Sequence, residues 1–217
     1  MSERPWKELY KTESPTNAIK TLAQRMSSKV TSSAYGRILG WSNARIPLQS
    51  KVTGTRHIKV GDRFDAAGPV WIEAISTFGG NTFEPYIAIG DRVSVSGGLH
   101  IGAVNSVTIG SDCLLGSGVL IIDHSHGYYD SSADASSPDL PPRLRPLAYG
   151  QPIVVGERCW IGDNVVVLEG VTIGAGSVVG ANSVVSRSLP ENCVAVGAPA
   201  KVVKMFTTQN GWTRPDV

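Results

Sequence analysis

A six-residue period dominates the sequence between Val155 and Ser188. When this segment is cut into sixes, a branched aliphatic residue fills the first column of every repeat, and glycine follows it in most repeats. The first column reads Val155, Ile161, Val167, Ile173, Val179 and Val185. An α-helix repeats every 3.6 residues and a strand every two, so neither element alone explains the pattern. One short strand plus one turn per repeat explains it, as in stacked solenoids.

Three such repeats predict one coil of a triangular prism, whose stacked coils pair their strands in parallel about 4.8 Å apart. The first column is expected to fill the prism, together with the small or branched residues of the fifth column. That fifth column reads Cys159, Val165, Val171, Ser177, Ser183 and Leu189. Glycine is abundant, at 24 of 217 residues, and suits turns that need a positive φ. The sequence predicts an all-β parallel solenoid in which the repeats are scaffold.

The register also holds upstream of this segment, from Ile89 onward, with two residues inserted between Ile101 and Ile109. It then stops, because residues 127–152 contain several prolines and no hexad. A loop of this length without its own secondary structure is uncommon and is usually functional or disordered. We expect it to leave from one corner of the prism, with the coil resuming directly after it.

Residues 15–28 predict a short amphipathic helix. Its apolar positions are Ile19, Leu22, Ala23 and Met26, which follow a Ser-Pro start at helical spacing. The apolar piece from Tyr35 to Trp41 is ambiguous. We therefore expect residues 1–55 to form an N-terminal cap or arm, residues 56–204 the prism, and residues 205–217 a tail that forms a closing helix or an arm.

Charge and cysteine content restrict the functional classes. The net charge is +2, and lysine and arginine are scattered without a basic run, so nothing supports nucleic-acid binding. No apolar run approaches the roughly 20 residues of a membrane span. Three cysteines are an odd number without a CxxC pair, which indicates free thiols in a reducing compartment and no metal site. These features predict a soluble cytoplasmic protein.

The sequence Asp123-His124-Ser125-His126-Gly127 ends the first block of repeats and opens the long loop. Its position predicts side chains at a corner of the prism. Imidazole titrates near neutral pH, so a histidine there can take a proton from a hydroxyl that attacks an acyl group. Asp123 or a backbone carbonyl would then fix the tautomer. The structural alternative is a loop histidine that is hydrogen-bonded to its neighbours.

Taken together, the hexads, the DHSHG break, the proline-rich loop, Cys159-Trp160-Ile161-Gly162 and the closing VGAPAKVV resemble the hexapeptide-repeat acetyltransferases. Within that family the chain is similar to the galactoside, maltose and bacterial polysaccharide O-acetyltransferases, over roughly residues 89–204. The resemblance implies a left-handed parallel β-helix, which is an exception to the right-handed crossover preference. It also implies a homotrimer with active sites between subunits, and acetyl-CoA as the acetyl donor.

The resemblance further implies roles for individual residues. Counted from Ile109 without gaps, the catalytic base of the sugar-acetylating relatives falls on His126, with His124 as its neighbour or the second choice. The acceptor-binding asparagine of the relatives is replaced by Ser96. The loop side chains that could contact the acceptor are Tyr128, Tyr129, Arg143 and Arg145. The two arginines could instead only pin the loop to a neighbouring subunit.

By the same resemblance, acetyl-CoA would lie in the groove between adjacent coils, against exposed backbone and cationic side chains. The implied contacts are Trp160, Gly162, Gly180, Ala181, Ser186, Arg187, Lys201 and Lys204. Cations at the nucleotide end would meet the phosphates. Trp160 could instead pack at the trimer seam, and the charged residues could be solvated surface.

The function predicted is acetyl-CoA-dependent O-acetylation of a sugar in a bacterial surface polysaccharide or its precursor, by direct transfer with a histidine base. N-acetylation of an amino-sugar nucleotide or a small xenobiotic, and a non-catalytic assembly module, are the alternatives. A cysteine nucleophile is disfavoured because Cys113 and Cys159 fit inward columns. A zinc hydratase resembling the gamma-class carbonic anhydrases is disfavoured because His100, His124 and His126 lack the required spacing.

Overall fold

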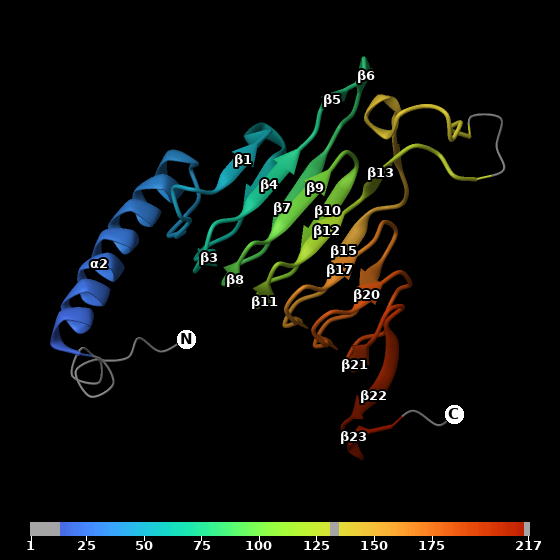
Figure 1. Ribbon diagram of the computed structural model, residues 1–217. Coiled ribbons are helices and arrows are strands. Elements are labelled where there is room, and N and C mark those ends of the chain that lie inside the picture. Colours follow the sequence, from blue (N-terminus) through green and yellow to red (C-terminus); the bar gives the residue numbers. More distant parts are fainter. Residues whose placement is uncertain (1–13, 131–134, 215–217) are drawn as a thin grey trace.

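The computed structural model describes residues 14–130 and 135–214, and the expectations for residues 1–13 and 215–217 lie outside the described residues. Three sheets of parallel strands form the faces of a triangular prism (Figure 1). The six-stranded sheet contains β1 (Lys51–Thr53), β4 (Trp71–Ala74), β9 (His100–Ala103), β12 (Leu120–Ile122), β17 (Val166–Val167) and β20 (Val184–Val185). The five-stranded sheet contains β2 (Ile58–Val60), β7 (Tyr86–Ile89), β10 (Ser106–Ile109), β15 (Ile153–Val155) and β18 (Thr172–Ile173).

The third sheet has eight strands and closes the C-terminal end of the prism. Its parallel part contains β3 (Asp65–Ala66), β8 (Ser94–Gly97), β11 (Leu114–Ser117), β16 (Trp160–Ile161), β19 (Val178–Val179) and β21 (Cys193–Val196). The chain visits the three sheets in turn, so each strand pairs with the strand one coil away rather than with its sequence neighbour. The predicted fold class, an all-β left-handed parallel β-helix, is confirmed.

The two inward columns fill the prism as predicted. First-column residues pair in register from coil to coil, for example Ile101 with Ile121, Ile121 with Val167, and Val167 with Val185. Every residue of both columns between Val155 and Leu189 is buried, with Leu189 the most exposed at 6%. This burial gives the repeat its physical cause, because each strand-and-turn unit must place two apolar or small side chains inside the prism.

All of the long excursions leave the prism at one edge, between the six-stranded and five-stranded sheets, which we call the first corner. The coil of β12 departs there into the long loop, which contains β13 (His124–His126), η2 (Pro142–Leu144) and β14 (Leu147–Tyr149). Two coils earlier the hairpin of β5 (Thr77–Phe78) and β6 (Asn81–Thr82) departs from the same corner. Both excursions project from the same side in Figure 1. The long loop was predicted and the hairpin was not.

The N-terminal helix α2 (Pro15–Ile38) differs from its prediction in length and in the face it buries. It begins after Ser14, whose hydroxyl accepts from the Asn17 amide, and runs ten residues past the predicted end. The Thr31 hydroxyl donates to the carbonyls of Ser27 and Ser28, so the run of serine and threonine stays helical. The predicted apolar positions face solvent, with Ile19 at 60% and Met26 at 63% exposure.

The helix contacts the prism only through its last turns. The Ser32 carbonyl accepts from the Ile46 amide, and Gly36 lies so close to Ala44 that an added Cβ would stand 2.5 Å from the Ala44 carbonyl oxygen. The remaining turns project away from the body (Figure 1). The expected cap is therefore made by residues 32–46, while the earlier part of the helix is an arm.

The C-terminal segment forms strands rather than a closing helix. β22 (Lys201–Thr207) pairs antiparallel with β21, and β23 (Gly211–Thr213) folds back on β22, where Trp212 packs on Phe206 at 5.4 Å between ring centroids.

Among the described residues no helix is both long and apolar enough to cross a membrane. The small η1 turn (Thr55–His57) joins β1 to β2.

Candidate active site

The carboxylate of Asp123 is fully buried under the first corner. Its two oxygens accept hydrogen bonds from the backbone amides of Val104 and Asn105, each at 2.9 Å. These two residues belong to the insertion between Ile101 and Ile109, so the irregularity in the repeat supplies the donors that the buried carboxylate needs. Asn105 also donates its side-chain amide to the Gly150 carbonyl at 2.9 Å, which ties the end of the long loop to the same corner.

His124 is oriented by this carboxylate. Its Nδ1 lies 3.1 Å from Asp123 Oδ1, and its side chain is 10% exposed. A carboxylate can only accept, so this bond requires the proton on Nδ1. In the neutral imidazole, Nε2 is then the acceptor. A histidine with a buried carboxylate on one nitrogen and a lone pair on the other has the arrangement of a general base.

The strand beneath His124 leaves space for its ring. A Cβ added at Gly102, on β9, would stand 3.2 Å from His124 Cε1, which is closer than ordinary van der Waals contact. A side chain at this position would push the ring away from the strand surface. The position of the His124 ring is thus set by its close approach to Gly102 and by its hydrogen bond to Asp123.

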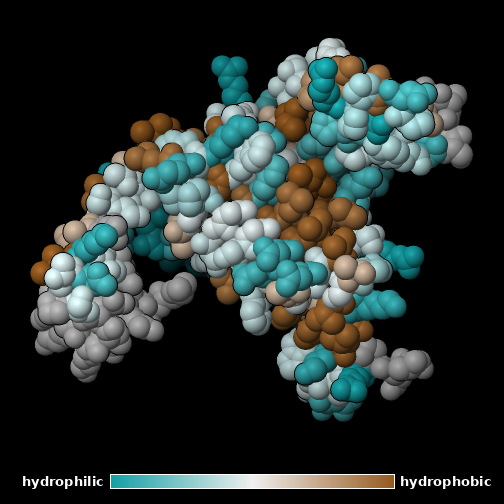
Figure 2. Space-filling model, in the orientation of Figure 1, coloured by the Kyte–Doolittle hydropathy of each residue, from teal (hydrophilic) through white to brown (hydrophobic). Residues whose placement is uncertain are grey.

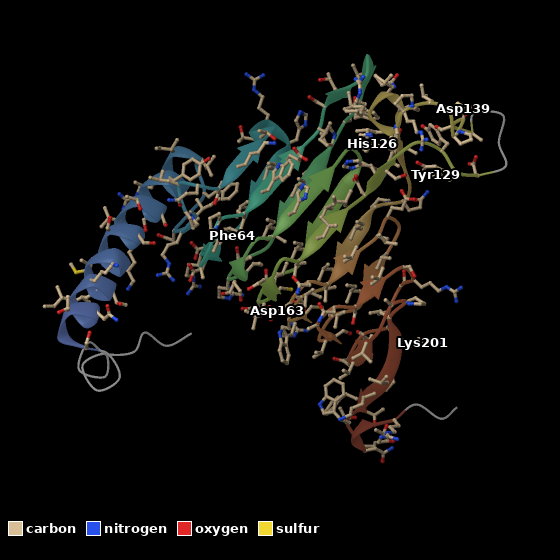
Figure 3. All side chains as sticks on the ribbon, viewed as in Figure 1. Phe64, His126, Tyr129, Asp139, Asp163 and Lys201 are labelled. Carbon is tan, nitrogen blue, oxygen red and sulfur yellow. The ribbon has the colours of Figure 1, made fainter. Side chains whose placement is uncertain are left out.

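His126 lies two residues further along β13 and is exposed. Its ring meets Phe78 of the β5–β6 hairpin edge to face, at 5.3 Å between centroids, and its carbonyl accepts from the Tyr129 hydroxyl at 2.5 Å. Figure 3 shows His126 and Tyr129 beside each other at the base of the long loop. The orienting carboxylate expected from the sequence, Asp123, thus contacts His124, the residue that the gap-free count did not choose.

The loop residues that were predicted to contact an acceptor have different surroundings. Tyr128 is half-buried, whereas Tyr129 is exposed and donates to the loop. Arg145 donates to the Tyr129 hydroxyl at 2.8 Å and to the carbonyls of Leu140 and Pro138, so it pins the loop to itself. Arg143 is exposed on η2. Arg145 thus fixes the loop within its own chain, whereas the alternative expected from the sequence was contact with a neighbouring subunit.

The residues predicted to bind acetyl-CoA lie mostly elsewhere. Gly162, Gly180 and Ala181 stand at the edge between the eight-stranded and six-stranded sheets, which we call the third corner, and Lys201 pairs with Val196 beside it. Four-residue β9 separates this corner from the first. At ~3.3 Å per residue the separation is about 13 Å. Figure 3 shows Lys201 well away from His126, towards the C-terminal end of the prism.

The other predicted residues are divided between the first corner and the eight-stranded face. Ser186 and Arg187 follow β20 at the first corner, two coils beyond His124. Ser96 on β8, Trp160 on β16 and Lys204 on β22 belong to the eight-stranded sheet, and all three are exposed. One chain therefore does not bring Ser96, Trp160 or Lys201 to the histidines.

All three thiols are free and buried inside the prism, as predicted. Cys113 and Cys159 stack in neighbouring coils, and the interaction between the two thiols raises the pKa of Cys113 and lowers the pKa of Cys159 to about 7. Burial raises the pKa of the Cys193 thiol as well. A buried thiol of raised pKa is a poor nucleophile. Among the described residues no group of three or more His, Cys, Asp and Glu side chains is arranged to hold a metal ion.

Sequence reasoning missed three contributors to this site: Asn105, Gly102 and the hairpin that carries Phe78. The hairpin had a readable signal, because Gly79-Gly80 stands between two short β-forming runs. Asn105 was marked only by the insertion around it. Gly102 had no signal, because glycine follows the column residue in most hexads.

Comparison with known proteins agrees with this architecture. Residues 152–187 match the family model described as bacterial transferase hexapeptide (six repeats). Over 120 residues the chain is 49% identical to the Escherichia coli (strain K12) protein named "Putative lipopolysaccharide biosynthesis O-acetyl transferase WbbJ". This match covers 55% of the chain and 61% of that relative. The chain thus carries the repeat of the bacterial hexapeptide transferases and spans somewhat under two thirds of the curated relative.

Solved structures show the same fold. A point mutant of AntD, an N-acyltransferase from Bacillus cereus, in complex with dTDP and coenzyme A, superposes with a TM-score of 0.58 at 16% identity, covering 81% of this chain and 89% of that one. A second AntD mutant, in complex with dTDP-4-amino-4,6-dideoxyglucose and coenzyme A, gives 0.56 at 19% identity, covering 77% and 83%. At these identities the likeness concerns the fold.

Proposed function

We propose that the protein is an acetyl-CoA-dependent O-acetyltransferase that acts on a sugar hydroxyl of a bacterial surface polysaccharide or its precursor. The observation that carries the proposal is the Asp123–His124 pair, held at the corner where a long aromatic loop leaves a hexapeptide-repeat prism. The 49% identity to a protein named for O-acetyl transfer in lipopolysaccharide biosynthesis supports the same class of reaction.

His124 is the better-supported base, although the alignment count favours His126. In the mechanism, His124 Nε2 takes the proton from the acceptor hydroxyl while Nδ1 donates to Asp123. The hydroxyl oxygen attacks the thioester carbonyl carbon, and backbone amides bind the oxyanion of the tetrahedral intermediate. When this intermediate collapses, the carbon–sulfur bond breaks and the imidazolium returns the proton to the CoA sulfur. The products are the acetyl ester and CoA.

The separation of the two corners supports a site shared between subunits. Acetyl-CoA bound along the third corner of one copy would face the histidines at the first corner of a neighbour, as in a homotrimer. We place the reaction in the cytoplasm, where acetyl-CoA is available and where free buried thiols are stable.

The test combines acetyl-CoA calorimetry with an assay of CoA release on a panel of glycosides and amino sugars. His124→Ala should lower kcat about 10²- to 10⁴-fold and leave the acetyl-CoA Kd nearly unchanged. Lys201→Ala/Lys204→Ala should raise that Kd about tenfold, because charge-assisted bonds to the phosphates are lost.

Other outcomes decide between the alternatives. A loss of turnover in His126→Ala but not in His124→Ala would assign the base to His126. Faster transfer to amines than to hydroxyls would indicate an N-acetyltransferase. Absence of any binding heat from a well-folded protein would favour a non-catalytic assembly module.

A further inference from the structure

The β5–β6 hairpin is an insertion in the second coil that reaches the long loop. The pairs Thr77–Thr82 and Phe78–Asn81 hold it together, and its tip is Gly79-Gly80, both at positive φ. The Phe83 amide donates to the Ser76 carbonyl at 2.9 Å and closes its base. The hairpin is therefore a short, ordered projection at the first corner.

Two aromatic contacts join the hairpin to the loop ribbon of β13 and β14. Phe78 meets His126, and Phe83 meets Tyr149 edge to face at 5.8 Å between centroids. The hairpin thus contacts both strands of the ribbon, one ring on each. These contacts leave a shallow, mostly open hollow of about 480 Å³, hereafter the pocket, between the two excursions.

Two residues that line the pocket, Leu147 and Tyr149, share a face of the ribbon with the histidines, although neither histidine lines the pocket itself. In the antiparallel pair β13–β14, His124 is opposite Tyr149 and His126 is opposite Leu147. Residues directly opposite in such a pair share a face, as do residues two apart on one strand. Tyr149 and Leu147 both line the pocket. A molecule seated there would lie on the same face of the ribbon as the imidazoles.

The lining is aromatic and neutral. It includes Asn81, Thr82 and Phe83 from the hairpin and Tyr128, Leu147 and Tyr149 from the loop. Aromatic rings suit the apolar face of a sugar ring, and the amide and hydroxyl groups can bond its hydroxyls. Among the described residues that line this pocket there is no charged side chain. The pocket therefore lacks the cations that a nucleoside diphosphate or a uronic acid would require.

We propose that the β5–β6 hairpin is an acceptor-specificity element, and that the pocket between it and the loop binds a neutral sugar residue of the acceptor. This inference rests on the proposed function and refines it. The hairpin would then contribute to binding of the acceptor, and so to its KM, but not to binding of acetyl-CoA. It also favours a neutral glycan over a sugar nucleotide as the acceptor.

The test uses the full-length protein with Phe83→Ala and Asn81→Ala. Phe206→Ala is the matched control, because it removes an exposed aromatic ring at the far end of the prism. The probes are the p-nitrophenyl glycosides of galactose, glucose and glucuronic acid. Saturation-transfer NMR measures their binding independently of turnover, and CoA release measures acceptor KM.

The neutral glycosides should bind the wild-type protein better than the glucuronide does. Phe83→Ala should raise acceptor Kd and KM about tenfold or more, Asn81→Ala somewhat less, and both should leave the acetyl-CoA KM unchanged. Phe83→Leu, which keeps apolar bulk without a ring, should fall between Phe83→Ala and wild type. It also keeps the test valid if the alanine variant folds poorly.

Unchanged glycoside binding in both hairpin variants would overturn the inference while leaving the acetyltransferase intact. Failure of the wild-type protein to bind any neutral glycoside would overturn it too. If the wild-type protein did not bind acetyl-CoA, that result would instead refute the proposed function, regardless of whether the glycosides bind.

Discussion

Gly102 provides a way to distinguish the two histidines. Its missing Cβ leaves the space that the His124 ring occupies, while His126 lies two residues further on, against Phe78. A change at Gly102 therefore acts on one imidazole only. The backbone there has no positive φ, so alanine is sterically compatible with the strand itself.

We predict that Gly102→Ala lowers kcat about 10- to 100-fold, because a methyl group 3.2 Å from Cε1 moves the base by a fraction of an ångström. The acetyl-CoA Kd and the thermal midpoint should change little. Steady-state kinetics and calorimetry on the same preparation would measure this. An unchanged kcat would mean that His124 is not the base and would return that role to His126.

The helix α2 and the repeats differ in how far sequence could predict them. The inward residues from Val155 to Leu189 were predicted one by one, because the close-packed interior of the prism accepts only apolar or small side chains at these positions. The predicted length of the helix was wrong, because the run of serine and threonine does not stop it: the Thr31 hydroxyl bonds back to the preceding turn and the chain stays helical. The direction of its apolar face could not be predicted, because periodicity shows that a stripe exists but not which face meets the body.

Only part of the candidate site at the first corner could be predicted from the sequence. Asp123 and His124 belong to a local sequence feature that breaks a strict period, and such breaks are visible in the chain. Their partners Asn105, Gly102 and Phe78 come from other coils, and only the stacking register brings them together. Local pattern pointed to the candidate site, while its geometry depends on contacts between residues far apart in sequence.

Deleting residues 1–30 should lower the thermal midpoint by less than about 2 °C, which for a chain of this size corresponds to under ~1 kcal/mol. The deleted turns bury little, as the 71% exposure of Val30 indicates. Gly36→Ala is the contrasting variant, because its Cβ would clash with the Ala44 carbonyl, and it should cost several degrees. A large, concentration-dependent drop on deletion would show that the exposed stripe is buried between copies.

In the proposed site, the first corner and the third corner would come together only between copies of the chain. Figure 2 shows apolar side chains gathered on one face of the prism. On the eight-stranded sheet, Trp160 and Leu114 are both more than a third exposed and pair in neighbouring strands. Such a ladder is suited to packing against a flat partner. An assembly that covers it can also align the third corner of one copy with the first corner of the next.

Mixing two impaired variants tests this arrangement. His124→Ala lacks the base, and Lys201→Ala/Lys204→Ala lacks the proposed phosphate contacts, so each alone should turn over slowly. Co-expressed in equal amounts, they should form mixed oligomers in which about a quarter of the sites combine an intact base with an intact neighbouring lysine pair. Activity should therefore return to roughly a quarter of wild type at limiting acetyl-CoA. If both groups served a site within one chain, every site would carry one defect, and mixing would restore nothing.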